Sequence, residues 1–352
     1  MRAPKTNVIV ISPALRAANN GNWRTAYRWS RFLRPCFDVE VCSAWTPAAR
    51  PNAQCMIALH ARRSAAAVAS FAEAHPDRPL IVVLTGTDLY RDVPSDAQAR
   101  RSLDLASHLV VLQEAAVDLL QSRYRRKCRV IYQSAPPLRA GMQSRRTFDV
   151  IFVGHMRAEK DPLTPMRALA WLPADSRVRL IQIGEALSDE YARAAQALQA
   201  RAWPSVQRYR WLGDRPHGET RRRISDAHAM VISSVMEGGA NVIVEAVSCG
   251  VPVIASRISG NIGMLGRDYD GYFGPGDDRE LARLLDRISR DRAFLAHLQQ
   301  QCAVRAPLFE PAREAAEVNR LVNDALEHRG PRIDVNRLHG ESDRFDSNQP
   351  ER

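Results

Sequence analysis

The chain has 352 residues, 45% of them hydrophobic, and its 50 lysines and arginines against 39 aspartates and glutamates give a formal charge of +11. This length exceeds one typical domain and suits two α/β domains. The charge favours anionic partners, but it is spread along the chain without basic blocks interleaved with aromatics, so a solvated basic surface is favoured over nucleic-acid binding.

Cysteine spacing and hydropathy indicate the cellular compartment. The six cysteines show no C-x-x-C pairing or metal-ligand spacing, and several lie in apolar runs, which indicates buried thiols in a reducing compartment. No apolar run approaches the roughly 18 residues of a membrane span. We therefore expect a cytoplasmic protein without a membrane span.

The first elements in chain order are a strand at 8–11, a polar loop, and a helix at 23–33. A strand, loop and helix in this order place ligands at the carboxyl edge of a parallel sheet. Gly21 in the loop would give the backbone room for a phosphate, although a plain turn fits equally well.

Alternating strands and helical stretches follow. Strands are expected at 39–43, 55–59, 80–84, 109–112 and 130–132, with a helix at 62–74. This alternation predicts a mostly parallel sheet with right-handed crossovers. Two strand ends carry polar residues: His60, Arg62 and Arg63 follow one strand, and residues 85–88 follow another. His60 is therefore either a structural histidine or a functional one.

The chain divides by these patterns into a first domain at 1–137, which ends at Pro136–Pro137, and a polar linker at 138–147. A second domain is expected at 148–308, followed by a helix at 309–328. Residues 329–352 are polar, charged and without periodicity, which predicts a disordered tail.

The second domain contains the most informative stretch, where a strand at 229–233 leads through Gly238 and Gly239 into a helix. The glycine pair lets the backbone approach a ligand, and the unpaired N–H groups of the first helical turn form an anion site. Glu237 and Glu245 would then hold hydroxyl groups on either side of the anion. The alternative is a helix with one capping and one exposed glutamate.

The rest of the second domain is expected to hold a strand at 148–153 that ends in Gly154, further strands at 178–183 and 208–212, and a buried strand near 251–255. Residues 256–266 are rich in glycine and are predicted to form a loop. Amphipathic helices are expected at 277–305 and 311–328.

The Glu237-x7-Glu245 arrangement resembles the motif of retaining glycosyltransferases of the GT-B fold, family four. The resemblance implies an α/β fold of two Rossmann-like parallel-sheet domains facing a cleft, with a C-terminal helix crossing back to the first domain. It also implies that Glu237 faces the donor sugar, that the amides of Gly239, Ala240, Asn241 and Val242 meet the diphosphate, and that Glu245 takes the ribose hydroxyls.

The segment from Gly154 to Lys160 is similar to the Gly-Arg-Leu-x-x-Glu-Lys segment of that family, whose basic residues grip the donor diphosphate. Lys160 matches the lysine of that segment. His155 stands where the arginine is expected, and Arg157 is displaced by two positions. We therefore expect Lys160 first, and Arg157 second, to contact the diphosphate.

From residue 8 to about 326 the chain also resembles a narrower group, the selenosugar synthases of selenoneine biosynthesis. The residues that carry this are 13–15 (PAL), 19–26 (NNGNWRTA), 84–90 (LTGTDLY), 159–163 (EKDPL), 237–242 (EGGANV) and 259–266 (SGNIGMLG). The last stretch stands where other family-four enzymes more often have Gly-Gly-x-x-Glu. This resemblance implies a donor, UDP-N-acetylglucosamine or UDP-glucose, and selenophosphate as the nucleophile, with loss of phosphate to leave a 1-selenosugar.

The chemistry implied by this group fits the residue types. Selenophosphate is already anionic near neutral pH, so its site needs cations more than a general base. Arg24, His60, Arg62 and Arg63 are the candidates for that role, while Lys160 and the helix amides would meet the charge on departing UDP. We therefore expect no essential divalent ion and no cofactor.

Two other functions compete with this one. The first is an ordinary family-four glycosyltransferase with a hydroxyl acceptor, and the second is a non-catalytic GT-B module that binds a nucleotide or a protein. The presence of Lys160, Glu237 and Glu245 together argues against the second, because a pure binding module does not need the whole set.

Overall fold

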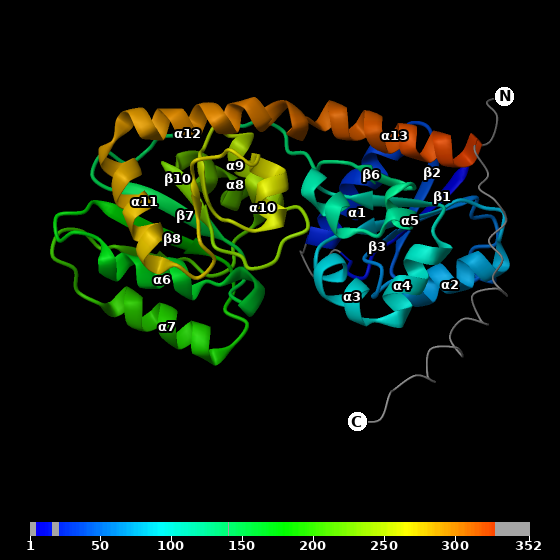
Figure 1. The fold of residues 1–352 in the computed structure, drawn as a ribbon, viewed down its shortest axis with the longest axis horizontal. Coiled ribbons are helices and arrows are strands. Elements are labelled where there is room, and N and C mark those ends of the chain that lie inside the picture. Colours follow the sequence, from blue (N-terminus) through cyan, green and yellow to red (C-terminus); the bar gives the residue numbers. More distant parts are fainter. Residues whose placement is uncertain (1–4, 16–20, 140, 328–352) are drawn as a thin grey trace, which may run out of the picture. The chain divides into compact units, whose positions relative to one another are not determined.

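The structure, a computed structural model, describes residues 5–15, 21–139 and 141–327. The chain forms two compact units (Figure 1). Unit 1 comprises Met1–Leu112, Val117–Ile131 and Ala315–Arg352, and unit 2 comprises Gln113–Ala116 and Tyr132–Glu314. The tail predicted at 329–352, and residues 16–20 of the first loop, lie outside the described residues.

Unit 1 is built on a sheet of six parallel strands in the order β2-β1-β3-β4-β5-β6. The strands are β1 (Asn7–Ile11), β2 (Asp38–Cys42), β3 (Cys55–Leu59), β4 (Leu80–Leu84), β5 (His108–Val111) and β6 (Cys128–Val130). β3 and β4 are buried along their whole length. Continuous apolar strands of this kind are typical of a parallel sheet covered on both faces.

Helices cover both faces of this sheet (Figure 1). The helices of unit 1 are α1 (Gly21–Leu33), α2 (Ala65–Ala74), α3 (Val93–Ser95), α4 (Ala97–Leu105), α5 (Ser122–Arg125) and the part of α13 (Pro311–Glu327) from Ala315 on. Alternate strand residues such as Val8 and Val10 share one core with α1 and α13. Ile9 and Ile11, which point to the opposite face, are buried as well. Contacts with β3 and β4 place α2 on the sheet, and α4 contacts β4.

The last helix returns to the first unit. Val318, Leu321, Val322 and Ala325 of α13 are fully buried in the core of unit 1, at the spacing of one helical face. Asn319 Nδ2 donates a hydrogen bond to the Phe32 carbonyl of α1 at 3.1 Å. The helix at the end of the chain therefore completes the core formed by its beginning.

Unit 2 has a second sheet of six parallel strands, in the order β12-β11-β10-β7-β8-β9. The strands are β7 (Phe148–Val153), β8 (Val178–Ile183), β9 (Tyr209–Trp211), β10 (Ala229–Ile232), β11 (Val253–Ser256) and β12 (Tyr272–Phe273). The helices are α6 (Leu163–Ala168), α7 (Asp189–Ala200), α8 (His217–Asp226), α9 (Asn241–Val247), α10 (Ser259–Leu265), α11 (Asp278–Arg290) and α12 (Arg292–Arg305). In Figure 1, α6, α7 and α11 lie on one side of this sheet and α8, α9 and α12 on the other.

Three sequence predictions are wrong in detail. The glycine-rich stretch predicted as a loop contains helix α10. Helix α2 begins at Ala65 rather than at residue 62, because the chain turns through 61–64 first. The sixth strand ends at Val130 instead of continuing to residue 132.

Candidate functional site

The strand order of unit 2 indicates where on its sheet a ligand would bind. The chain runs from β7 to β8 and β9 on one side, and β10 to β12 lie on the other side of β7. The loops that follow β7 and β10 therefore leave the carboxyl edge in opposite directions. Ligands of open α/β sheets bind at such a topological switch point.

The two loops at this switch point carry Lys160 and Glu237. Lys160 Nζ and Glu237 Oε1 form an ion pair, and the Ser234 hydroxyl donates to the same Oε1 at 2.6 Å. Both charged side chains are mostly buried. A carboxylate that is shielded from water and bonded to a cation and a hydroxyl has a fixed orientation.

The backbones of the same loops are bonded to each other. The Val235 amide donates to the Glu159 carbonyl at 3.0 Å, and the Ser233 hydroxyl donates to the Asp161 carbonyl at 2.7 Å. Asp161 adopts a left-handed backbone conformation with φ of 44°, and its carboxylate accepts from the Thr164 hydroxyl at 2.6 Å. These contacts hold Lys160 in place at the end of its short turn.

Helix α10 reaches the same loop through a glycine. A Cβ atom added to Gly260 would lie closer than 3.0 Å to the carbonyl and side chain of Glu237, a separation that real Cβ atoms essentially never show. The glycine content that predicted a loop is therefore required by close contact between a helix and the Glu237 backbone.

Gly263 belongs to the stretch that departs from the Gly-Gly-x-x-Glu pattern, and a side chain at this position would overlap Gln113. A Cβ on Gly263 would meet the side-chain oxygen of Gln113, which is fully buried and accepts from the Ala116 amide at 3.1 Å. The Gly263 carbonyl accepts from the Tyr132 hydroxyl at 3.1 Å and from Arg305 at 3.0 Å. The Gln113 side chain thus occupies the space into which a side chain at 263 would extend.

Glu245 lies on α9, the helix that follows the Glu237 loop. Its side chain is 6% exposed, and its Oε1 lies 2.6 Å from Nε2 of His217, the first residue of α8. Residues Gly238 to Ala240 precede α9, and Asn241 and Val242 form its first turn. Sequence reasoning missed His217 and Ser234, since neither belongs to a spaced motif.

The basic residues after β7 differ in their surroundings. Arg157 is half-exposed and lies 3.7 Å from Glu159. His155 Nδ1 accepts from the Glu185 amide at 3.1 Å, so this residue joins the loops after β7 and β8. Lys160 is therefore the basic residue of this segment that directly contacts Glu237.

Unit 1 has a switch point of its own, between β1 and β3. His60 follows β3 directly, is buried, and has a left-handed φ of 71°. Among non-glycine residues of the described chain, only His60 and Asp161 have positive φ. Strained backbone of this kind clusters at functional sites, and each of the two lies at a switch point.

The imidazole of His60 is held on both nitrogens. Nε2 lies 3.0 Å from the Thr87 hydroxyl, and Nδ1 accepts from the Arg63 amide at 3.3 Å. Burial lowers the pKa of His60 and nearby Arg63 adds to this, while Asp88 and Asp92 oppose it. The imidazole is therefore neutral near neutral pH.

Asp88 organises the loops around His60. This fully buried carboxylate accepts from the amides of Ala61 at 2.9 Å, Thr85 at 2.9 Å and Gly86 at 2.8 Å. It joins the loop after β3 to the loop after β4. Its position shows why the residues predicted at two separate strand ends lie together.

The remaining residues assigned to the acceptor are more exposed. Arg62 Nε lies 2.6 Å from Asp96 Oδ2, and Arg63 is exposed. Gly21 begins α1 and its carbonyl accepts from the Thr25 hydroxyl at 3.0 Å, with Arg24 in the same first turn. α1 starts at the carboxyl edge beside β1, so its first turn belongs to the same edge as His60.

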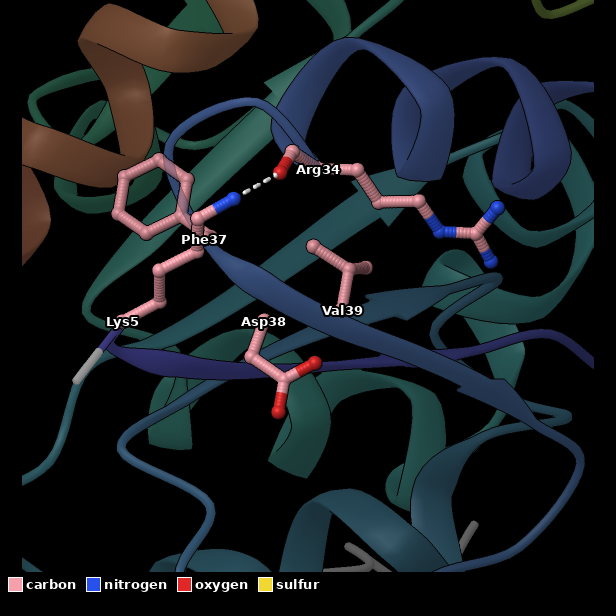
Figure 2. A pocket seen from close by; sticks show the side chains of 5 residues that line it. All are labelled: Lys5, Arg34, Phe37, Asp38 and Val39. Carbon is pink, nitrogen blue, oxygen red and sulfur yellow. Dashed lines mark hydrogen bonds between the residues drawn. The ribbon is translucent and has the colours of Figure 1, made fainter. Parts of the chain in front are cut away.

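A shallow pocket lies at the opposite edge of this sheet. Its lining comprises Lys5, Arg34, Phe37, Asp38 and Val39, and Figure 2 shows the Lys5 ammonium bonded to the Arg34 carbonyl. These residues precede or begin β1 and β2, so the pocket is at the amino edge. Substrates of open α/β sheets bind at the other edge.

In the described part of the chain, no group of three or more histidine, cysteine, aspartate or glutamate side chains is placed to hold a metal ion. Asp268 and Asp270 are spaced Asp-x-Asp, but Asp270 Oδ2 pairs with His297 at 2.7 Å and accepts from Gln301 at 3.0 Å. No described helix is both long and apolar enough to cross a membrane.

Comparison with known families bears on unit 2. Residues 143–306 match the family described as "Glycosyl transferases group 1", and they contain Lys160, Glu237 and Glu245. Residues 143–306 thus match a group 1 glycosyltransferase domain. A D-inositol 3-phosphate glycosyltransferase of Corynebacterium glutamicum is 30% identical over 190 residues, which cover 50% of this chain and 43% of that protein. The match thus spans less than half of the length of this curated relative.

Solved structures resemble most of the chain, including residues 143–306. Anabaena Alr3699/HepE in complex with UDP-glucose has a TM-score of 0.71 at 16% identity, covering 90% of this chain and 99% of that one. Sucrose-phosphate synthase from Thermosynechococcus elongatus has a TM-score of 0.72 at 16% identity, covering 92% and 100%. The chain therefore has the GT-B fold, with two six-stranded parallel sheets and their helices.

Proposed function

We propose that this chain is a glycosyltransferase that uses a UDP-sugar and transfers its hexose, glucose or N-acetylglucosamine, to selenophosphate. The observation that supports a UDP-sugar donor is the ion pair of Lys160 and Glu237, which lies at the switch point of the segment that matches the group 1 family. Supporting it, Anabaena Alr3699/HepE of the same fold is described in complex with UDP-glucose.

The donor would be held by residues of unit 2. Lys160 meets the diphosphate, together with Arg157 and the backbone from Gly238 to Val242, and Glu237 faces the sugar. Departure of UDP places negative charge on the bridging oxygen. A preorganised ammonium near that oxygen stabilises the charge more in the transition state than in the bound donor, which accelerates the chemical step.

The acceptor would be held by residues of unit 1 around His60. Because its pKa is lowered, His60 provides a hydrogen bond rather than a positive charge, and the cations for an anionic acceptor are then Arg24, Arg62 and Arg63. The selenium of selenophosphate forms a bond to C1 of the sugar while the C1–O bond to UDP breaks. Water then cleaves the Se–P bond, which releases inorganic phosphate and the 1-selenosugar.

A hydroxyl acceptor is the second candidate. The specific observation in its favour is the neutral imidazole of His60, whose unprotonated Nδ1 would accept the proton that a hydroxyl must lose once its 3.3 Å contact with the Arg63 amide opens. The curated relative is named for D-inositol 3-phosphate, a phosphorylated polyol that carries such hydroxyl groups.

Mass spectrometry of reaction mixtures tests the proposal. The purified chain is incubated with UDP-glucose or UDP-N-acetylglucosamine and with selenophosphate, inorganic phosphate or D-inositol 3-phosphate. We expect a selenosugar and UDP only with selenophosphate. A glycosylated inositol phosphate without a selenosugar would establish the second candidate, and donor consumption with no acceptor dependence would contradict both.

A further inference from the structure

Helix α8 begins with a histidine that contacts the Glu245 carboxylate. His217 Nε2 lies 2.6 Å from Glu245 Oε1. His217 is 46% exposed on its side chain, whereas Glu245 is 6% exposed. One member of the pair therefore reaches solvent while the other is enclosed.

We propose that His217 is a positioning residue that orients the Glu245 carboxylate toward the ribose hydroxyls of the donor nucleotide. This inference rests on the proposed function, in which Glu245 takes the ribose. A carboxylate offers about four acceptor sites on its two oxygens, so a bond from Nε2 to Oε1 restricts its orientation and leaves acceptor capacity for a diol.

The connectivity places both residues at the correct edge of the sheet. α8 begins after β9 and α9 begins after β10, so the first turns of both helices lie at the carboxyl edge of parallel strands. Glu245 lies in the second turn of α9. The contact between the start of α8 and Glu245 therefore lies near the sheet edge at which a ligand of the switch point would bind.

Other groups near Glu245 serve the fold. Arg221, one turn further along α8, is buried and donates to the Pro136 carbonyl. Burial raises the pKa of the Cys249 thiol, which lies one turn beyond Glu245, and Arg221 opposes that rise. Arg221 is thus engaged with the chain before β7 and with Cys249, whereas His217 bonds the Glu245 carboxylate directly.

The test measures binding of UDP, 2′-deoxy-UDP and 3′-deoxy-UDP by calorimetry to the full chain. Wild type is expected to bind UDP about tenfold or more tightly than either deoxynucleotide, the range of a hydrogen bond to a charged group. His217→Ala should reduce this preference to about twofold. His217→Gln should restore most of it, because the glutamine amide places an N–H donor near the position of Nε2.

A matched control exists in the same unit. His297 and Asp270 form a pair of similar length, 2.7 Å, with both side chains about half exposed at 49% and 55%. His297→Ala should leave the preference for UDP unchanged. Since the preference is a ratio measured on one variant, it does not depend on the folded fraction of that variant.

Equal weakening of all three nucleotides by His217→Ala would overturn the inference, because the histidine would then act on the fold alone. Loss of the preference in both His217 variants alike, or its absence in wild type, would also overturn it. Failure of wild type to bind any of the three nucleotides would instead contradict the proposed UDP-sugar donor.

Discussion

Lys160 and Glu237 are separated by 77 positions in the chain and meet as an ion pair where β7 and β10 end. The two strands are neighbours in the sheet, and the chain leaves them in opposite directions. An ammonium and a carboxylate that are mostly buried must satisfy each other, so the pair fixes the geometry of both loops. A ligand phosphate at this point would meet a lysine already held in position.

Gly260 is predicted to be essential for this geometry. Gly260→Ala should destabilise the chain by about 1–3 kcal/mol and lower kcat, because the added methyl overlaps the Glu237 carbonyl. Gly218→Ala is the control, since nothing lies within 4 Å of its Cβ, and it should be neutral or slightly stabilising. Thermal unfolding of the two variants gives the comparison, and equal stability of both would contradict the packing described at Gly260.

Binding of the proposed acceptor should depend on arginine more than on His60. Arg63→Ala is expected to raise the KM for selenophosphate and to leave the KM for the UDP-sugar nearly unchanged. Arg62→Ala should have a smaller effect, because Arg62 is paired with Asp96. His60→Gln should keep measurable activity, since glutamine still donates a hydrogen bond.

Arg34→Ala is the control for these acceptor variants, because Arg34 lies at the amino edge of the same sheet (Figure 2). Steady-state kinetics with each substrate varied separately provide the measurement. If His60→Gln abolishes turnover while both arginine variants behave as wild type, a general-base mechanism with a hydroxyl acceptor replaces the cationic pocket.

Turnover should survive removal of divalent ions. Lys160 supplies the positive charge that a metal ion supplies in other transferases, so activity in excess EDTA should equal activity without it. The measurement compares initial rates of the untreated chain, of the chain in EDTA, and of the chain in EDTA followed by excess magnesium. Loss of activity with EDTA and its recovery with magnesium would show a metal requirement.

Acid pH should destabilise unit 2 through His228. Burial lowers the pKa of His228 below its ordinary 6.5, although Asp149 opposes this. The folded chain then binds fewer protons than the unfolded chain below that pH, so stability is full above about pH 6.5 and declines as the pH falls. Each titrating group contributes a slope of at most about 1.4 kcal/mol per pH unit.

His228→Asn should make this decline shallower, because asparagine can accept the bond from the Asp149 amide without titrating. Phe148→Leu is the comparison: it removes the ring stacked on His228 at 4.6 Å but keeps the titrating group, so a decline with falling pH should persist. Unfolding midpoints between about pH 7 and about pH 5 show which variant changes the slope. A slope altered by Phe148→Leu alone would assign the effect to packing.

Local patterns predicted much of the fold. The strands β3, β4 and β8 have the predicted bounds, because each is a short apolar run bordered by turn residues. Helix α10 was missed because its glycines are imposed by Glu237 and Gln113, which are distant in the chain. Tertiary contact here overrides the low helix propensity of glycine.

The candidate site was predictable only as two separate loops. The resemblance to a family segment indicated Lys160, and the glycine pair before a helix indicated Glu237, but the pairing of β7 with β10 is what joins them. The contact of His217 with Glu245 depends on how α8 and α9 pack. The residues next to either one in the sequence do not predict that packing. The position of Asp88 near His60 likewise depends on the register of β3 and β4, which local sequence patterns do not predict.

Calorimetric titration of UDP into the wild-type chain, Lys160→Met, Glu245→Ala and Arg167→Ala tests the central claim, a UDP-sugar site at the switch point of unit 2. Arg167 pairs with Asp278 on the surface of the same unit at 3.0 Å and serves as the control. We predict that wild type and Arg167→Ala bind UDP equally well and that Lys160→Met and Glu245→Ala each bind it about tenfold more weakly or worse. Folded Lys160→Met and Glu245→Ala variants that bind UDP as wild type does, or a wild type that does not bind UDP, would contradict it.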